Sequence, residues 1–328
     1  MSPLFRVVQL LVVTISAVAI PAVYGQAFPD HALRIIVPYP PGGGTDAVIR
    51  PLTDAVSAKL GQPVFIDNRP GGNTFIGMNA CAKAQADGYT LCVTNADALS
   101  FGPFVFSKIP YDPSKDLVGI TKLAATPTAI VISGQLPFNT LPEVFAYARA
   151  NPGVLNFGSF GTGTVGHLYA EWFRRQLNAD MTHVPYRGAA PIIPALINNE
   201  VQVSWMALSL VLPHVKTGRV KVVALDYPSR IPQLPDVPTL SELNANPDIQ
   251  SYFGLYAPVG TPSAVQNRLN AAFTDALRDP KVQESFSGLL FVATPTSIKE
   301  FNGARVQEAE HARQVTLSIG IKPMDLPQ

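Results

Sequence analysis

Two glycine-rich segments have the residue types and the spacing needed to bind an anion. Residues 35–46 read IIVPYPPGGGTD, and residues 156–167 read NFGSFGTGTVGH. In each, a short apolar run typical of a strand leads through a glycine-rich loop into a pattern typical of a helix. Backbone N–H groups and the positive end of the helix dipole would converge above such a loop. The sequence therefore predicts two anion-binding loops that could close on one carboxylate.

The second loop also matches the G-x-G-x-x-G spacing of dinucleotide-binding folds, at residues 161–166. In that motif an acid at the end of the following strand binds the ribose, whereas here residues 182–187 read THVPYR and Asp180 precedes the strand. Arg187 could in principle meet a 2′-phosphate. A carboxylate loop is the better interpretation, because it uses the same backbone groups with fewer requirements. We therefore predict no cofactor.

Catalytic and metal-binding patterns are weak in this chain. The segment around Ser159 lacks the first glycine of G-x-S-x-G, because position 157 is Phe. The five histidines have no metal-ligand spacing, and two cysteines do not make a typical structural zinc site. His167, at the start of a predicted helix, is the histidine that we expect near a ligand or its waters. We predict a binding protein with no metal site, and we keep an exported enzyme as an alternative.

The N-terminal residues indicate export. Arg6 precedes an uncharged apolar run at residues 7–20, and small residues follow, which is the pattern of a signal peptide at residues 1–25. The run is short for a membrane span, which needs about 20 residues, although an uncleaved anchor helix is the alternative. We predict cleavage after Gly25 or Ala27 and a soluble, exported protein.

Composition limits the partners and the size of the fold. The 24 Lys and Arg residues nearly balance the 23 Asp and Glu residues, which gives a formal net charge of +1 over 328 residues. A nucleic-acid or membrane-surface partner would require clustered basic residues, so we predict neither. The length suggests two domains. Cys81 and Cys92 lie on a predicted helix and the strand after it, where a disulfide and two buried thiols are both plausible.

Short β-branched runs alternate with helical patterns along the chain, as in βαβ units around parallel sheets. After a proline-rich passage, residues 254–258 read GLYAP and two more helices follow. This C-terminal part has too few strands to build its own sheet, so we expect it to return to the first lobe. Two sequential domains split near residue 130 are the alternative. The predicted strands are 33–37, 64–66, 90–94, 130–132, 155–158, 182–184, 201–203 and 220–225, and 205–215 is predicted as a helix.

Ordered segments along the chain carry a family resemblance. Besides the first loop, they are 60–64 (LGQPV), 67–72 (DNRPGG), 87–91 (DGYTL), 183–188 (HVPYRG), 212–219 (LPHVKTGR), 234–239 (LPDVPT) and 257–262 (APVGTP). Together they resemble one known family, the Bug-type periplasmic receptors of tripartite tricarboxylate transporters, over almost the whole mature chain. The resemblance implies an α/β fold of two lobes, the type II periplasmic-binding-protein fold, with a ligand cleft between the lobes. We expect lobe 1 at residues 28–125 plus 251–328 and lobe 2 at 126–250.

The resemblance also implies a function and a site. A monomer in the periplasm would capture a small organic carboxylate and deliver it to a membrane permease, with a signalling partner as an alternative. In the family both loops hold one carboxylate through backbone amides, hydroxyls and waters, which avoids desolvating a buried cation. Carried over residue by residue, this implies ligand contacts from Tyr39, Pro40, Gly43, Thr45 and Asp46 on the first loop, and from Ser159, Gly161, Thr162, Gly163 and His167 on the second.

The far end of the ligand would meet loops that differ between family members. Three segments are expected there: residues 72–75, which include Phe75, residues 94–97, which include Asp97, and residues 203–209, which include Ser204 and Trp205. The last segment departs from the family, in which an acidic or amide residue is common after the corresponding strand.

These departures bear on the identity of the ligand. An amino acid would need a carboxylate for its ammonium group, and only Asp46 and Asp97 remain for that role. Trp205 and Met206 would suit a flat apolar body, although packing within the lobe is the alternative role of Trp205. We therefore expect an aromatic, phthalate-type diacid, with a C4–C6 di- or tricarboxylate or an amino acid as alternatives.

Overall fold

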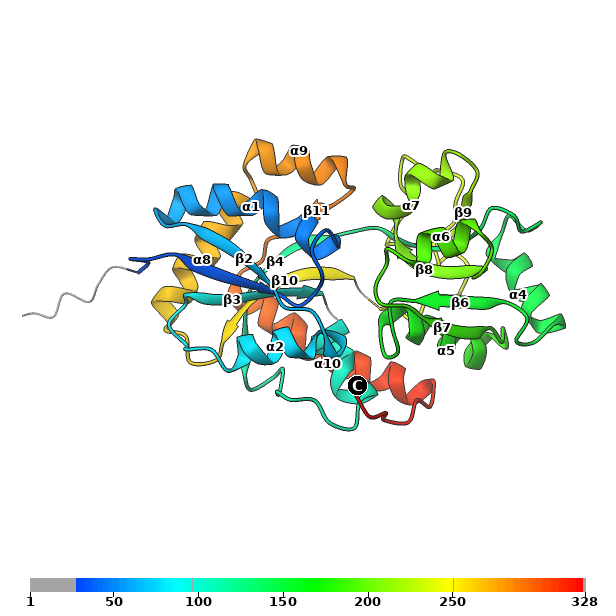
Figure 1. Ribbon diagram of the computed structural model, residues 1–328, viewed down its shortest axis with the longest axis horizontal. Helices are drawn as coiled ribbons and strands as arrows, with labels where there is room; N and C mark the ends of the chain where they lie inside the picture. The colour runs from blue at the N-terminus through cyan, green and yellow to red at the C-terminus, as the bar shows by residue number, and fades with distance from the viewer. Residues whose placement is uncertain (1–27, 96, 250, 327–328) are drawn as a thin grey trace, which may run out of the picture.

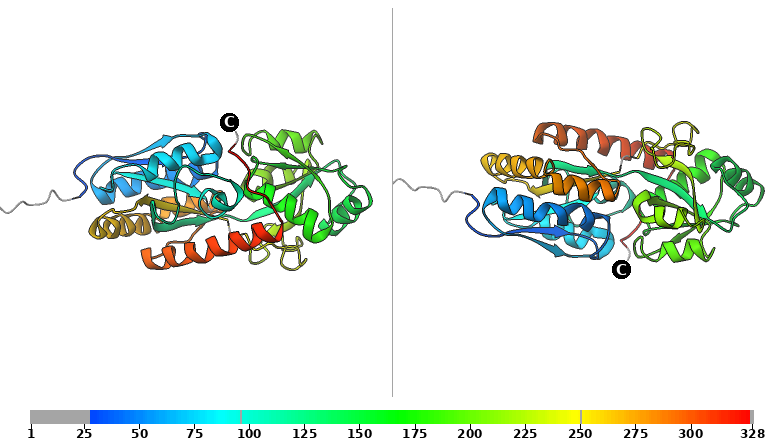
Figure 2. Two further views of the ribbon diagram at one scale, coloured as in Figure 1. Left: turned by 90° about the horizontal axis from the view of Figure 1, so that it is seen from below. Right: turned by 90° about the horizontal axis from the view of Figure 1, so that it is seen from above.

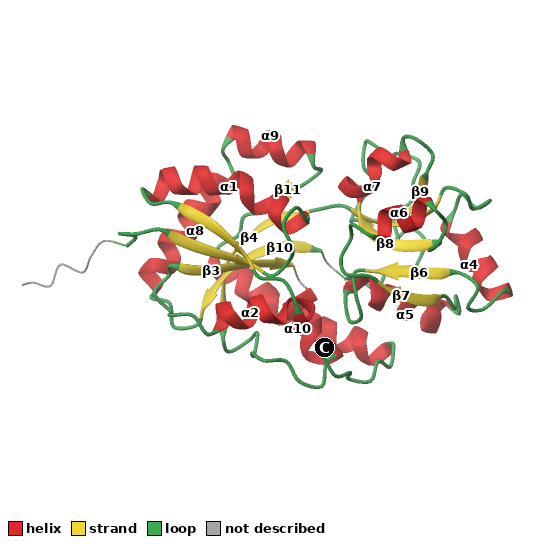
Figure 3. Cartoon of the chain, viewed as in Figure 1, coloured by secondary structure: helices red, strands yellow, loops and turns green. Residues whose placement is uncertain are grey.

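The chain folds into two α/β lobes that lie side by side (Figure 1). The structure, a computed structural model, describes residues 28–95, 97–249 and 251–326. The predicted signal peptide and its cleavage points lie outside these residues. Each lobe has one sheet flanked by helices (Figure 3), which confirms the predicted α/β class with two lobes. Within the described residues, no helix is both long and apolar enough to cross a membrane.

The sheet of the first lobe has the strand order β11-β4-β10-β3-β1-β2. β1 is parallel to β2 and β3, as in βαβ units, whereas β10 lies antiparallel between β3 and β4. The C-terminal part of the chain therefore contributes a central strand to the first sheet. The strands are β1 (Leu33–Val37), β2 (Val64–Asn68), β3 (Thr90–Asn95), β4 (Leu117–Ala125), β10 (Tyr252–Pro258) and β11 (Val292–Ala293).

The sheet of the second lobe has the order β7-β6-β8-β5-β9. β6 is parallel to β7 and β8, and β5 is antiparallel to β8 and β9. The predicted helix at 205–215 is wrong at its start, because Trp205 belongs to β8, where it lies opposite Ile130 of β5. The strands are β5 (Thr128–Ser133), β6 (Asn156–Ser159), β7 (Thr182–Pro185), β8 (Val203–Ala207) and β9 (Val220–Asp226).

Helices cover both faces of each sheet because successive strand residues point to opposite sides. In β1, Ile35 packs with one layer of helices and Ile36 with the other. Around the first sheet, α1 (Gly44–Leu60), α8 (Ser263–Ala276) and α9 (Pro280–Gly288) share one core, and α2 (Phe75–Ala82), α3 (Gly102–Val105) and α10 (Ile298–Ser318) lie on the other face. Around the second sheet, α4 (Leu141–Ala150) and α5 (Val165–Leu177) oppose α6 (Ile192–Ile197) and α7 (Leu208–Val215), and the short helices η1 (Gly72–Thr74) and η2 (Asp97–Phe101) complete the first lobe.

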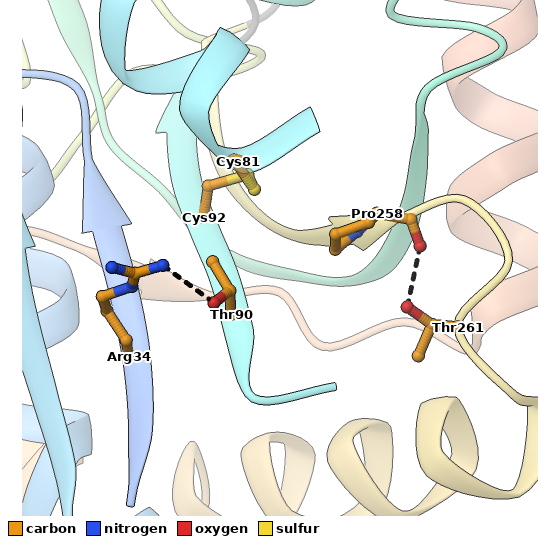
Figure 4. Close-up of a disulfide and its surroundings, with 6 residues drawn as sticks. All are labelled: Arg34, Cys81, Thr90, Cys92, Pro258 and Thr261. Atoms are coloured by element: carbon orange, nitrogen blue, oxygen red, sulfur yellow. Dashed lines mark hydrogen bonds between the residues drawn. A yellow bond between two sulfur atoms is a disulfide. The ribbon is translucent and has the colours of Figure 1, made fainter. Parts of the chain in front are cut away.

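A disulfide joins Cys81 of α2 to Cys92 of β3 (Figure 4), so the structure decides between the two alternatives that the sequence left open. The two Cα atoms are 6.0 Å apart. The bond fastens the C-terminal end of α2 to β3 of the sheet. It restricts the unfolded chain more than the folded one and so stabilises this part of the first lobe.

The two sheets direct the carboxyl ends of their parallel strands toward the junction of the lobes. β1 and β6 run toward each other in Figure 1, and the two glycine-rich loops follow these strands. Ligands of open α/β sheets bind beyond the carboxyl ends of strands. From the membership of the strands in the two sheets, we propose that the lobe boundaries lie at residues 125/126 and 250/251.

Candidate functional site

The first loop connects β1 to α1. Gly42 has φ +86°, a conformation that glycine adopts without strain, and Gly43 is the N-cap of α1. No side chain caps this helix, so the N–H groups of Gly44 and Thr45 in its first turn have no acceptor within the helix. Pro40 and Gly43 are exposed. The loop thus presents donors and the positive end of a helix dipole to an anion.

Asp46 supports this loop from below. Its carboxylate accepts hydrogen bonds from the Gly42 N–H at 2.6 Å, from Asn68 Nδ2 at 3.0 Å and from Arg50 Nη2 at 3.0 Å. Burial acts to raise the pKa of Asp46, but the hydrogen bonds from Asn68, Gly42 and Arg50 outweigh it, so the pKa is lowered. The side chain is 2% exposed. Its partners within the protein indicate that Asp46 shapes the loop.

Tyr39 connects the start of the same loop to the end of β3. Its hydroxyl hydrogen-bonds to the side chain of Asn95 and lies 3.4 Å from Thr94 Oγ1, and its carbonyl accepts from Asn68 Nδ2 at 3.1 Å. Residues 94 and 95 were expected to contact the far end of the ligand. Tyr39 therefore joins the predicted carboxylate loop to the predicted specificity segment of β3.

The second loop connects β6 to α5 and is held by its own side chains. Ser159 Oγ accepts the Gly161 N–H at 3.2 Å, and Thr164 Oγ1 donates to the Gly161 carbonyl at 2.8 Å. The Gly163 N–H donates to His167 Nδ1 at 3.0 Å. Gly161 and Gly163 have φ values of +141° and +83°. Thr162, between these glycines, is partly exposed, and α5 begins without a side-chain cap.

A pair of histidines lies beneath this loop. Ser159 Oγ is 2.6 Å from His183 Nε2, and the His183 ring stacks on the His167 ring at 4.2 Å. Burial lowers the pKa of His183 to about 4, helped by the neighbouring His167. Burial also lowers the pKa of His167, although Glu171 opposes the shift. Both rings are therefore neutral at pH 7.

Sequence reasoning missed the Ser159–His183 pair, because the two residues lie on different strands and no local motif joins them. A serine bonded to a histidine resembles the start of a nucleophilic site. Here Ser159 is 0% exposed and its hydroxyl also bonds to Gly161. The pair thus supports the loop from inside the lobe.

The lobes meet at the second loop. An ideal Cβ on Gly161 would lie 3.6 Å from Asn73 Oδ1, and one on Gly163 would lie 2.6 Å from Phe106 Cζ. Asn73 belongs to η1 and Phe106 follows α3, so both contacts cross from the second lobe to the first. The second loop therefore lies against the first lobe at η1 and at the end of α3.

Three residues predicted at the far end of the ligand lie in the interior. Phe75 is 2% exposed and packs against Phe106, and Ser204 is 0% exposed and donates to the Gly158 carbonyl at 2.7 Å. Trp205 is 3% exposed, and its Nε1 donates to Asp226 Oδ2 at 2.7 Å. The side chain of the fourth, Asp97, lies outside what the structure describes.

Asp226, at the end of β9, is an acid that sequence reasoning overlooked. Its carboxylate accepts from Trp205 Nε1 and, at 2.9 Å, from Thr128 Oγ1. Burial raises its pKa, although these hydrogen bonds oppose the shift. Among the described residues it forms no ion pair. The sequence feature that could have identified Asp226 is its position directly after the predicted strand 220–225.

A cavity of about 360 Å³ is lined by residues of η2 and α10, by Lys122 and by residues 248–249, and by none from the two loops. Two of its charged side chains pair, since Lys122 Nζ lies 3.1 Å from Glu308 Oε1, and the same Nζ lies 4.0 Å from the centre of the Tyr252 ring. In the part of the chain that the structure describes, no three His, Cys, Asp or Glu side chains gather as a metal site requires.

The two-lobed fold, with a glycine-rich loop after a parallel strand in each lobe, defines the class of two-lobed periplasmic binding proteins. Solved structures with the same fold include MatC from Rhodopseudomonas palustris with bound malate, at 29% identity, a TM-score of 0.80 and coverage of 88% of this chain and 99% of MatC. Another R. palustris protein, with adipate, matches at 27% identity and a TM-score of 0.83, over 90% of this chain and 100% of its own.

Sequence comparison identifies the family. BugT from Bordetella pertussis is 31% identical over 312 residues, which cover 94% of this chain and 95% of BugT. Residues 48–307 match the model of TctC, the tripartite tricarboxylate transporter family receptor. The chain belongs to this family of solute-binding receptors, as the resemblance in the sequence predicts.

Proposed function

We propose that this protein is a periplasmic receptor that binds one small dicarboxylate between its lobes and delivers it to a transporter permease. The observation that carries the proposal is the pair of glycine-rich strand-loop-helix turns at the junction of the lobes, each opening a helix without a side-chain cap. Uncapped N–H groups of two helices, together with the hydroxyl of Thr162, suit a carboxylate.

The proposed ligand contacts are a subset of those predicted from the sequence. From the first loop we retain Tyr39, Pro40, Gly43 and the N–H group of Thr45, whose side chain is buried, and we assign Asp46 to the support of the loop. From the second we retain Thr162, whereas the N–H groups of Gly161 and Gly163 donate to Ser159 and His167, and these four residues shape the loop. This division follows from the hydrogen bonds that Asp46, Ser159 and His167 make within the protein.

For the body of the ligand we favour an aliphatic chain of the size of malate or adipate, which two structural relatives bind. The aromatic, phthalate-type diacid expected from the sequence rested on an accessible Trp205 ring. That ring is 3% exposed, so it offers little surface to a ligand. The aromatic ligand stays a prediction with less support.

A thermal-shift screen of organic acids tests the proposal. A binder is stabilised by about 2.7 kcal/mol when the ligand is present at a hundredfold excess over its dissociation constant. We expect malate, adipate or a related dicarboxylate to raise the melting temperature and to be recovered unchanged. Chemical conversion of the ligand would support the enzyme alternative, and no shift with any acid would contradict the proposal.

An amino-acid ligand is a second candidate, because Asp226 is a partly buried carboxylate without an ion-pair partner among the described residues. If an ammonium group binds there, glutamate should bind to the wild type, and Asp226→Asn should weaken it at least tenfold. Our proposal expects malate binding to change less than threefold in this variant. Asp236→Asn, at an exposed acid of the same lobe, is the matched control.

A further inference from the structure

The second loop rests directly on the first lobe at Gly163. An ideal Cβ there would lie 2.6 Å from Phe106 Cζ and 2.9 Å from Val105 Cγ1. Real Cβ atoms do not approach other atoms so closely, so only glycine fits without a shift of its neighbours. The Gly163 N–H simultaneously donates to His167 Nδ1. The backbone of the loop is thus held between His167 of its own lobe and Phe106 of the other.

Phe106 is fixed by the packing of the first lobe. It is 3% exposed, and its ring meets the Phe75 ring edge to face at a centroid distance of 5.3 Å. Phe75, 2% exposed, also contacts the ring of Tyr111 at 6.1 Å. Edge-to-face contacts of this kind favour one orientation of each ring. The surface that receives Gly163 is therefore well defined before any ligand arrives.

The C-terminal segment holds the same surface from the other side. The Met324 N–H donates to the Val105 carbonyl at 2.9 Å, and the Ser107 N–H donates to the Met324 carbonyl at 2.8 Å. Ser107 Oγ also donates to Asp325 Oδ1 at 2.8 Å. These bonds flank Phe106 on both sides along the chain, and they limit the movement of its backbone.

The same C-terminal region also contacts the second lobe. α10 extends along the first lobe and past the junction (Figure 2). Near its end, Gln176 Nε2 of α5 donates to the Ser318 carbonyl at 3.0 Å. The second loop leads directly into α5. α10 and the segment after it therefore contact both lobes, α5 of the second and the backbone beside Phe106 of the first.

We propose that Phe106 is a positioning residue for the carboxylate site, which seats the second loop against the first lobe through Gly163. We call the contact between Gly163 and the Phe106 ring the seat. The inference rests on the proposed function, because it makes the seat part of the closure of the lobes on a dicarboxylate. The loop reaches its binding position only when Gly163 lies on the Phe106 ring. The fit of this seat therefore contributes to ligand affinity although Phe106 need not touch the ligand.

The substitution Gly163→Ala tests the seat, and Gly218→Ala is its matched control. Both glycines lie in the second lobe at positive φ, +83° and +69°, so both substitutions introduce similar backbone strain. An added Cβ at Gly218 would meet nothing within 4 Å. We expect Gly163→Ala to raise the dissociation constant for malate or adipate at least tenfold in calorimetry, and Gly218→Ala to change it less than twofold.

A compensating substitution separates the seat from a general loss of structure. Phe106→Leu removes the part of the ring that the new Cβ would strike. The double variant Gly163→Ala/Phe106→Leu should therefore recover at least threefold of the affinity lost in Gly163→Ala, because the two changes are coupled through contact. Equal affinities of Gly163→Ala and Gly218→Ala, or no recovery in the double variant, would overturn the inference.

Small-angle scattering without ligand tests the seat independently of the proposed ligand. Gly163→Ala should have a larger radius of gyration than Gly218→Ala, because its lobes can no longer meet at the loop. Equal radii would overturn the seat even if no acid binds to the wild type. If the wild type binds no carboxylate while the radii differ, the proposed function fails and the seat stands.

Discussion

The two glycine-rich loops have the same plan but different supports. The first is held by the carboxylate of Asp46, which bonds to Gly42 and pairs with Arg50. The second is held by neutral groups, with Ser159 and His183 beneath the glycines. A loop that presents N–H groups to an anion can thus be stabilised by a charge or by uncharged hydrogen bonds. The difference predicts that the two loops respond differently to mutation and to pH.

The largest effect is expected at the charged support. Asp46→Asn keeps the shape of the side chain but removes the charge that pairs with Arg50 and one acceptor from the buried network. We expect the free energy of unfolding in urea to fall by about 2–4 kcal/mol. Asp54→Asn, at an exposed position on the same helix, should change it by less than about 0.5 kcal/mol. Equal effects of the two variants would contradict a supporting role for Asp46.

The neutral support should make the second loop sensitive to acid. The pKa of His183 is lowered from 6.5 to about 4. At pH values between these two, the imidazole binds a proton in the unfolded chain but not in the folded chain. The free energy of unfolding should therefore decrease as the pH falls from 6.5 toward 4, by about 2–3 kcal/mol for this group. Above pH 6.5 the contribution is constant.

His183→Gln isolates this contribution. The variant should show a shallower loss of stability between pH 6.5 and 4 than the wild type, whatever its stability at pH 7. His214→Gln, on α7 and away from the pair, should keep the slope of the wild type. Asp46, whose pKa is lowered from 3.8, contributes only where its carboxylate protonates in the unfolded chain, so the first loop adds no such slope above about pH 5. Identical slopes in the wild type and His183→Gln would contradict the account of the second loop.

A smaller effect is expected at Trp205. Trp205→Phe removes the hydrogen bond to Asp226 but keeps an aromatic ring in the core, so the free energy of unfolding should fall by about 1–2 kcal/mol. The affinity for dicarboxylates should change less than twofold, as it should in the control Trp172→Phe. A selective loss of aromatic acids in Trp205→Phe would restore the aromatic ligand that the sequence predicted.

Local signals explain what the sequence predicts correctly. Glycine and proline mark both loops, and β-branched runs mark β1, β3 and β9 within a residue or so of their ends. β4 was missed, because its residues LVGITKLAA mix glycine, lysine and alanine with the apolar positions. Trp205 was placed in a helix, because the apolar run through β8 and into α7 contains no residue that separates strand from helix.

The roles of the site residues depended on contacts that are distant in sequence. Nothing around Ser159 indicates that His183 lies beside it, and nothing around Asp46 indicates that Asn68 completes its hydrogen bonds. Phe75 follows a glycine-rich turn and was expected on a loop, but it begins α2 and packs into the core. Sequence patterns located the loops, whereas the division between ligand contact and loop support required the fold.

The central claim is that the two loops together bind one carboxylate group of a small dicarboxylate. Calorimetric titration of the wild type, Thr162→Val and the exposed control Thr217→Val with malate and adipate tests it most directly. We expect one site per chain in the wild type, a loss of about 1–2 kcal/mol in Thr162→Val because a hydroxyl donor is removed, and no change in Thr217→Val. Absence of binding in the wild type, or full affinity in Thr162→Val, would contradict the claim.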